Sequence, residues 1–138
     1  MRIKILPEDT ICSKYIRKRD GRCVRCGSKV EFNANGDPVS HQASHFWSRG
    51  NWATRFDPDN VDTLCFGCHQ MWGGDYRRDY EAFKINQLGK KAFIKLEQKA
   101  HSYANKLKER ASAKAFYKVE YPKLHSNSYW KGHFKNNE

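Results

Sequence analysis

The sequence predicts a small α+β domain in which a short β-hairpin and several helices are stabilised by one structural zinc ion. Two Cys-x-x-Cys motifs, Cys23 to Cys26 and Cys65 to Cys68, supply four thiols suited to tetrahedral zinc. Two strand-like runs, residues 40–46 and 61–64, precede the second motif and are separated by a polar stretch rich in turn residues. Only 38% of the 138 residues are hydrophobic, so a bound metal would compensate for a small core.

The charge balance favours an anionic polymer as partner. The chain has 26 Lys and Arg against 15 Asp and Glu, a net charge of +11, and basic surfaces bind nucleic acid through counterion release. A ribosomal or membrane-surface protein would have a similar balance. No apolar run is long enough for a signal segment or a membrane span, so we expect an intracellular protein that does not enter membranes. Thiols stay reduced there, which favours metal binding over disulfides and leaves the unpaired Cys12 as a packing residue.

One domain is expected over residues 1–115, with a basic, aromatic C-terminal extension over residues 116–138. The apolar spacing predicts helices over about 7–20, 75–88 and 90–115, the second capped by Asp75 and ended by a glycine. The apolar stripe of the third runs from Phe93 to Leu107. It would pack either on the domain or against a second subunit, which leaves a homodimer open.

Three residues around the second Cys pair have the chemistry of phosphodiester hydrolysis. His45 ends the first strand-like run, Asn60 precedes the second, and His69 follows Cys68 at the start of a helix. Their order and spacing resemble a ββα-metal (HNH) nuclease with a treble-clef-like zinc site. In that arrangement His45 would be the general base, Asn60 would hold the loop that orients it, and His69 would bind a catalytic cation.

Ser44 stands where an HNH site usually has an acid just before the base, so the second cation ligand would have to come from another residue. His41, four residues before His45, would share its strand face and is one substitute; Asp75 is another. Basic residues near these motifs suit phosphate contacts, although those of the first helix would equally form a solvated face. The predicted DNA-binding residues are Arg17, Lys18, Arg19, Arg49, Arg55, Arg77 and Arg78.

The assembled motifs resemble the NinG family of phage recombination proteins, also called the Rap type. The resemblance covers roughly residues 10–100 and differs from the family at two positions, where Ser44 replaces glycine and His69 replaces asparagine. It is carried by residues 13–20, Cys23-x-x-Cys26-Gly27, residues 43–46, 48–50, 53–57 and 60–61, Cys65-x-x-Cys68, Gly73-Gly74, Tyr80 and Leu88-Gly89.

The resemblance implies a structure-specific endonuclease, similar to endonuclease VII-type resolvases, acting on Holliday junctions and D-loops with Mg²⁺ or Mn²⁺. It also implies the cytoplasm of a cell that carries a phage or prophage. Two alternatives remain: an HNH nicking or homing-type endonuclease on duplex DNA, and a non-catalytic zinc-stabilised DNA-binding protein. The presence of His45, Asn60 and His69 together counts against the last, because a binding protein needs no general base.

Overall fold

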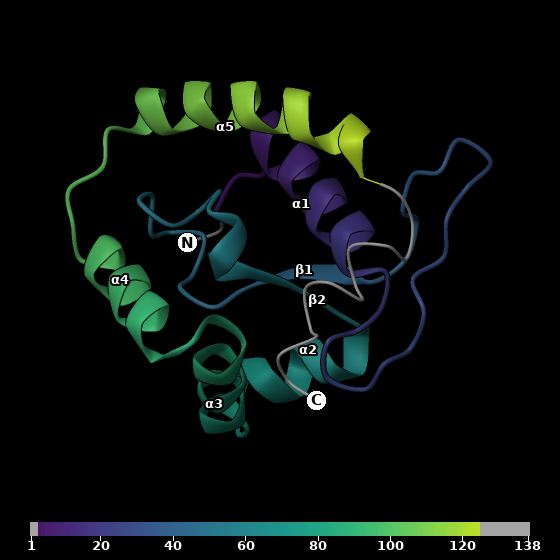
Figure 1. Cartoon of the computed structure of the whole chain (residues 1–138), viewed down its shortest axis with the longest axis horizontal. Coiled ribbons are helices and arrows are strands. Elements are labelled where there is room, and N and C mark those ends of the chain that lie inside the picture. The colour runs from purple at the N-terminus through teal and green to yellow at the C-terminus, as the bar shows by residue number, and fades with distance from the viewer. Residues whose placement is uncertain (1–2, 125–138) are drawn as a thin grey trace.

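The structure, a computed structural model, describes residues 3–124 and has the α+β architecture that the sequence predicts (Figure 1). Over these residues it contains five α-helices and one two-stranded sheet. No helix within this range is long and apolar enough to cross a membrane. The elements are α1 (Pro7–Asp20), β1 (Gln42–His45), η1 (Pro58–Asn60), β2 (Val61–Leu64), α2 (Phe66–Gly73), α3 (Arg77–Leu88), α4 (Lys90–Ala100), α5 (Lys106–Glu120) and η2 (Tyr121–Lys123).

The β-hairpin lies at the centre of the molecule, between two groups of helices (Figure 1). β1 pairs antiparallel with β2 in a register that sets Gln42 opposite Leu64 and His45 opposite Val61. α1 contacts both strands and α5 packs on α1, whereas α2 contacts both strands and is followed by α3 and then α4. The hairpin therefore has a packed helix on each side.

Two small apolar cores correspond to these two groups of helices. The first joins α1, α5 and the start of β2, and it buries Cys12 as the sequence predicts. The second joins the end of β1, the two Cys-x-x-Cys motifs, α2, α3 and α4; in it the Trp72 ring stacks on Tyr80 with centroids 4.6 Å apart. Neither core is large, which agrees with the expected need for a metal staple.

The helix predicted over residues 7–20 is confirmed, with the same bounds in α1. Pro7 occupies its first turn, where the missing N–H leaves no hydrogen bond unmade. The Asp9 carboxylate accepts a hydrogen bond from the Leu6 N–H at 2.8 Å, which satisfies one free donor at the helix start. Gly21 ends the helix in the left-handed conformation, with φ of 69°.

The prediction of a single helix over residues 90–115 is wrong, because α4 ends at Ala100 and α5 begins at Lys106. Polar side chains cause the break. The Ser102 hydroxyl donates to the Lys99 carbonyl at 2.6 Å, and the Asn105 side chain accepts from the Lys108 N–H at 3.0 Å, which caps α5.

The apolar stripe expected from Phe93 to Leu107 is divided by the same break. Phe93, Leu96 and Ala100 are buried within the chain, whereas Tyr103 and Leu107 are 90% and 77% exposed. The buried half of the stripe therefore packs on the domain itself, which was one of the two alternatives. A homodimer stays a prediction.

The boundary expected at residue 115 falls inside α5, which continues to Glu120. Tyr117 is fully buried in the first core and donates a hydrogen bond to the Phe56 carbonyl oxygen. The Tyr121 hydroxyl donates to Asp37 at 2.6 Å. The start of the expected extension is thus part of the domain, and residues 125–138 lie outside the described residues.

The prediction that Asp75 caps the helix over residues 75–88 is also wrong. Tyr76 is the N-cap residue of α3, and no side chain caps the helix there.

Candidate active site and metal centre

The four cysteines of the two Cys-x-x-Cys motifs converge on one point. Their sulfur atoms all lie within 4.8 Å of one another, and the Cys26 and Cys65 sulfurs are 3.8 Å apart. Gly27, with φ of 81°, makes the reversal that follows the first pair, and the Cys65 sulfur accepts the Cys68 N–H at 3.5 Å at the start of α2. Four thiols at these separations fit a single tetrahedral metal ion, and zinc is the usual choice for such a set.

The cysteine cluster also fixes where α2 begins. The Val24 N–H donates to the Thr63 carbonyl at 2.9 Å, which attaches the first cysteine turn to β2. Cys65 caps α2 and Cys68 lies in its first turn, so a metal ion bound by all four thiols would hold this turn against the first cysteine turn. His69 follows directly, so its position depends on the cluster.

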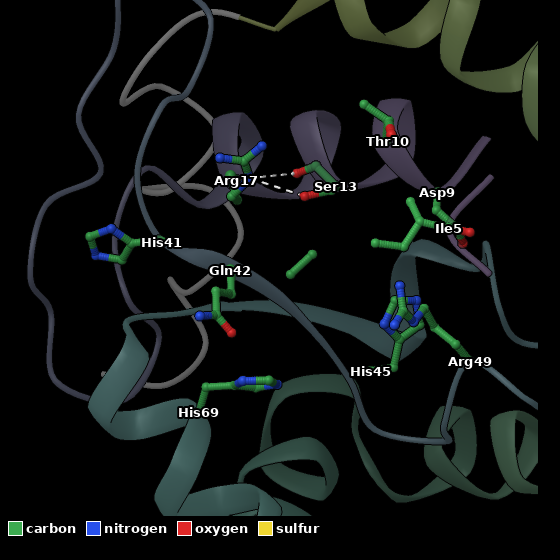
Figure 2. Close-up of a pocket in the computed structure, with 11 residues that line it drawn as sticks. Ile5, Asp9, Thr10, Ser13, Arg17, His41, Gln42, His45, Arg49 and His69 are labelled. Carbon is green, nitrogen blue, oxygen red and sulfur yellow. Dashed lines mark hydrogen bonds between the residues drawn. The ribbon is translucent and has the colours of Figure 1, made fainter. Parts of the chain in front are cut away.

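A pocket of about 560 Å³ lies between α1, β1 and the start of α2. His45 enters it from β1 and His69 from α2, as Figure 2 shows. Arg17, Arg49 and Gln42 line the same space. The structure therefore brings together two of the three predicted catalytic residues and two of the predicted DNA-binding arginines.

The His45 ring is oriented by a backbone carbonyl. Its Nε2 lies 2.9 Å from the Arg55 carbonyl oxygen, an acceptor, so in the neutral ring Nε2 carries the hydrogen. Nδ1 then keeps its lone pair and can accept a proton. Burial lowers the pKa of His45 to about 4, and the nearby positive charge of Arg49 acts in the same direction. At neutral pH the ring is therefore unprotonated.

Asn60 closes the loop between the two strands. It is fully buried, and its side-chain oxygen accepts the Trp47 N–H at 2.8 Å. Its amide nitrogen donates to the carbonyls of Trp47 at 2.9 Å and Thr54 at 3.0 Å. Its own carbonyl accepts the Phe46 N–H at 2.8 Å, directly after His45. These are the backbone hydrogen bonds expected of a residue that holds the His45 loop, and a contribution to catalysis stays a prediction.

His69 is half-buried, and burial lowers its pKa. Within residues 3–124 its ring nitrogens make no hydrogen bond to protein, so they are available to a cation. Gln42 lines the same pocket as His69, and Figure 2 shows both side chains in the view into it. An amide oxygen is a suitable ligand for a hard divalent cation. Gln42 is therefore a candidate second ligand that motif spacing missed, because the sequence does not show which strand residues line the pocket.

Ser44 does not line the pocket. It is buried opposite Asp62 in the hairpin, on the strand face that meets Tyr80 and Lys84 of α3. Side chains alternate along a strand, so position 44 and His45 project to opposite faces.

His41 lines the pocket, but its ring is committed elsewhere. The backbone of His41 has φ of 68°, outside the range of a strand, so the expected alternation with His45 fails at this residue. Its Nδ1 lies 2.8 Å from the Ser40 hydroxyl and its Nε2 lies 3.0 Å from the Ser28 hydroxyl. Asp75, the other substitute considered, is exposed and does not line the pocket. The contacts of His41 therefore do not favour it as a cation ligand.

Two arginines expected to bind DNA are instead buried in ion pairs. Arg55, 2% exposed, binds both oxygens of Asp9 at 2.9 and 2.6 Å. Arg19, 3% exposed, pairs with Asp20 at 2.8 Å and donates to the Val61 carbonyl at 2.9 Å. A buried guanidinium needs such partners, so neither side chain is free for phosphate.

Arg17 and Arg49 reach the pocket. Arg17 is half-buried and donates to the Ser13 hydroxyl at 3.1 Å and to the Ser40 carbonyl at 3.1 Å, which orients its guanidinium along the pocket edge (Figure 2). Arg49 is half-buried near His45 and makes no ion pair at contact distance within residues 3–124. Both remain predicted phosphate contacts.

The other predicted DNA-binding residues lie outside the pocket. The Lys18 ammonium lies 4.9 Å from the centroid of the Tyr121 ring. Arg77 is exposed, and its guanidinium lies 4.1 Å from the centroid of Phe46. Arg78 is exposed as well. Their contact with DNA stays a prediction.

The fold and site together define a small α+β protein with a four-cysteine cluster that could hold a metal ion and a histidine-lined pocket at a hairpin–helix junction. Comparison with known proteins gives the family. The chain matches the family described as "Bacteriophage Lambda NinG protein" over residues 7–127 and therefore belongs to the NinG family.

A protein of Lactococcus phage SK1 named "Probable HNH endonuclease" is 36% identical over 66 residues, which is 46% of this chain and 67% of that protein. No solved structure matches the chain significantly. The family predicted from the motifs is thus confirmed.

Proposed function

We propose that this protein is a metal-dependent endodeoxyribonuclease of the HNH type that cleaves branched recombination intermediates such as Holliday junctions and D-loops. The family and the name of the phage relative support a nuclease. The observation that carries the proposal is the contact between His45 Nε2 and the Arg55 carbonyl at 2.9 Å, in the pocket that also receives His69. It leaves Nδ1 of a neutral imidazole as a proton acceptor in the same pocket as a ring that can bind a cation.

His45 would accept the proton of the attacking water through Nδ1. A pKa of about 4 makes the ring a weak base in the free protein, because a general base acts best when its pKa lies near the working pH. DNA corrects this. Phosphate groups entering the pocket beside Arg17 and Arg49 bring negative charge close to His45, and negative charge raises the pKa of an imidazole.

A divalent cation would be held by His69, with the Gln42 amide oxygen as the second protein ligand. When bound, Mg²⁺ or Mn²⁺ supplies positive charge that stabilises the scissile phosphate and the leaving oxygen. Both protein ligands are neutral, so we expect weak cation binding without DNA and tighter binding once phosphate oxygens complete the ligand set.

The test is cleavage of a synthetic Holliday junction, a D-loop and a linear duplex under single-turnover conditions with Mg²⁺ or Mn²⁺. We expect faster cleavage of the branched substrates, leaving 5′-phosphate and 3′-hydroxyl ends. His45→Ala should abolish most of the activity, whereas His101→Ala, at an exposed position outside the pocket, should not. Equal cleavage of the duplex would favour a nicking enzyme. DNA binding without cleavage under any divalent cation would favour a non-catalytic DNA-binding protein.

A further inference from the structure

A second cavity, of about 590 Å³, lies beside the active-site pocket, between the N-terminal segment, the loop after β1 and the start of α5. Apolar side chains make much of its wall: Ile3, Leu6, Trp52 and Leu107. Leu107 is 77% exposed, so its side chain is accessible to a ligand in the cavity. A volume of this size is within the range of pockets that hold small organic ligands.

The rim of the cavity is positively charged. Lys4 and Lys106 are exposed and make no ion pair within residues 3–124, and Arg110 pairs with Glu8 at 2.6 Å. The Lys106 ammonium lies 5.5 Å from the centroid of the Trp52 ring. An apolar wall with unpaired cations at its edge suits a ligand with a flat ring and an attached anion. In a protein that carries a net charge of +11, that description fits a nucleotide.

The cavity is joined to the active site through Arg55. The carbonyl of Arg55 accepts the His45 ring hydrogen at 2.9 Å, while its guanidinium lies 4.5 Å from the centroid of Trp52. The same chain segments line both spaces: Arg49 faces the first and Gly50 the second. A DNA strand that passes His45 would therefore meet this cavity within a short distance along its backbone.

We propose that the cavity receives one unpaired nucleotide of the DNA substrate, with the base against Trp52 and Leu107 and the phosphate near Lys4 and Lys106. The inference rests on the proposed function in that it takes DNA as the ligand. A base must leave the duplex stack to enter such a pocket, and this costs least where it is already unpaired. The cavity would thus select DNA at branches and bulges, and it supplies a physical basis for the branch preference proposed above.

The experiment measures DNA binding in the His45→Ala protein, which prevents cleavage during the measurement. Two ligands are compared by fluorescence anisotropy: a duplex with one unpaired thymidine, and the same duplex with an abasic analogue in its place. The phosphates are identical, so the comparison isolates the base. We expect the base-containing ligand to bind about tenfold more tightly, the order expected for one base packed on aromatic and apolar side chains.

Leu107→Glu and Lys106→Glu should each reduce this preference to less than about twofold, because one places a carboxylate on the apolar wall and the other reverses a rim charge. Both side chains are exposed, so both variants should fold. Val119→Glu is the matched control: it lies on the same helix, is 56% exposed and does not line the cavity. It should keep the tenfold preference.

Crosslinking locates the base directly. A 5-iodouracil at the unpaired position should crosslink to the peptide that contains Trp52 or to the start of α5. Equal affinity for the base and abasic ligands, an unchanged preference in Leu107→Glu, or crosslinks confined to other segments would each overturn the proposal.

Failure of this inference is distinct from failure of the proposed function. If the parent protein cleaves branched DNA but binds the base and abasic ligands equally, the proposed nuclease function is supported and the cavity has no role in base binding. If the parent cleaves nothing but binds the unpaired base through Leu107, the base-binding role of the cavity is supported and the proposed nuclease function is refuted.

Discussion

Acidification from about pH 7.5 to about pH 5 should destabilise the folded protein through His45. Burial lowers the pKa of His45 in the folded protein to about 4, whereas an unfolded chain has the ordinary histidine pKa of 6.5. Between these two values the unfolded chain binds a proton that the folded protein does not. Stability therefore increases with pH across this window, and it is lost as the pH falls through 6.5 toward 4.

The size of the effect follows from the two pKa values. At about pH 5 the unfolded imidazole is almost fully protonated, which favours the unfolded chain by about 2 kcal/mol, while protonation of the folded protein contributes almost nothing. At about pH 7.5 both contributions are close to zero. The expected loss is thus about 2 kcal/mol, a large part of the stability of a small domain.

Urea unfolding of the parent and of His45→Gln at both pH values measures this contribution. The glutamine amide can still donate to the Arg55 carbonyl but does not titrate. Thiols, carboxylates and His69 are common to both proteins, so their pH dependence cancels in the comparison. The parent should lose about 2 kcal/mol more than His45→Gln.

A parallel loss of stability in the two proteins would refute this reasoning. So would an NMR titration in which the His45 ring of the folded protein has a pKa near 6.5. Either result would mean that the ring is solvated, and the case for a neutral, oriented base would fail with it.

Three further predictions concern the site and its support. His45→Ala should slow single-turnover cleavage on the order of 10²- to 10⁴-fold with little change in DNA affinity, and full activity in this variant would contradict the mechanism. His69→Ala should also lose activity, which raised Mn²⁺ should partly restore, whereas it should not restore activity to His45→Ala. His69→Asn should lose less activity than His69→Ala. Cys65→Ser should lower zinc content and melting temperature, whereas Cys12→Ser should keep its zinc; a parent-like metal content in Cys65→Ser would remove the zinc centre. Asn60→Ala should lose about 3 kcal/mol of unfolding free energy because it removes three side-chain hydrogen bonds at a buried position; a loss under about 1 kcal/mol in urea would show that the loop does not depend on it.

Features set by short-range chemistry could be predicted from the sequence. The bounds of α1 follow from Pro7 at its start and Gly21 just beyond its end. The strand pair follows from two apolar runs around a polar turn, and α2 follows from Cys65 at its cap and the glycines after it. In each case the signal and the structure that it specifies lie within a few residues.

Features set by long-range partners could not be predicted. Arg55 lies in a basic, polar loop and has the sequence context of a phosphate ligand, but its partner Asp9 is 46 residues away. Arg19 likewise belongs to a basic run, and its acceptors at Pro58 and Val61 come from a distant turn and strand. Charge alone does not show whether a guanidinium faces solvent or a carboxylate, because that depends on tertiary packing.

The same contacts explain why the proposed cation site has neutral ligands. The Asp9 carboxylate lines the pocket, but Arg55 binds both of its oxygens. Burial raises the pKa of Asp9, but the hydrogen bonds and positive charge of Arg55 lower it further, so the net shift is downward. A carboxylate engaged in this way has little capacity left for a metal. The proposed ligands His69 and Gln42 carry no charge to offset the dehydration of Mg²⁺, so we propose that phosphate oxygens of DNA supply the anionic ligands. We therefore expect cation and DNA binding to be coupled, each raising the affinity for the other by the same factor. Calorimetric titration of Mn²⁺ into His45→Ala should show weak binding to the free protein and much tighter binding to its complex with DNA. Equal Mn²⁺ affinity of the free protein and of the DNA complex would mean that the protein alone supplies the anionic ligands. The Asp9 carboxylate would then have to leave its ion pair with Arg55.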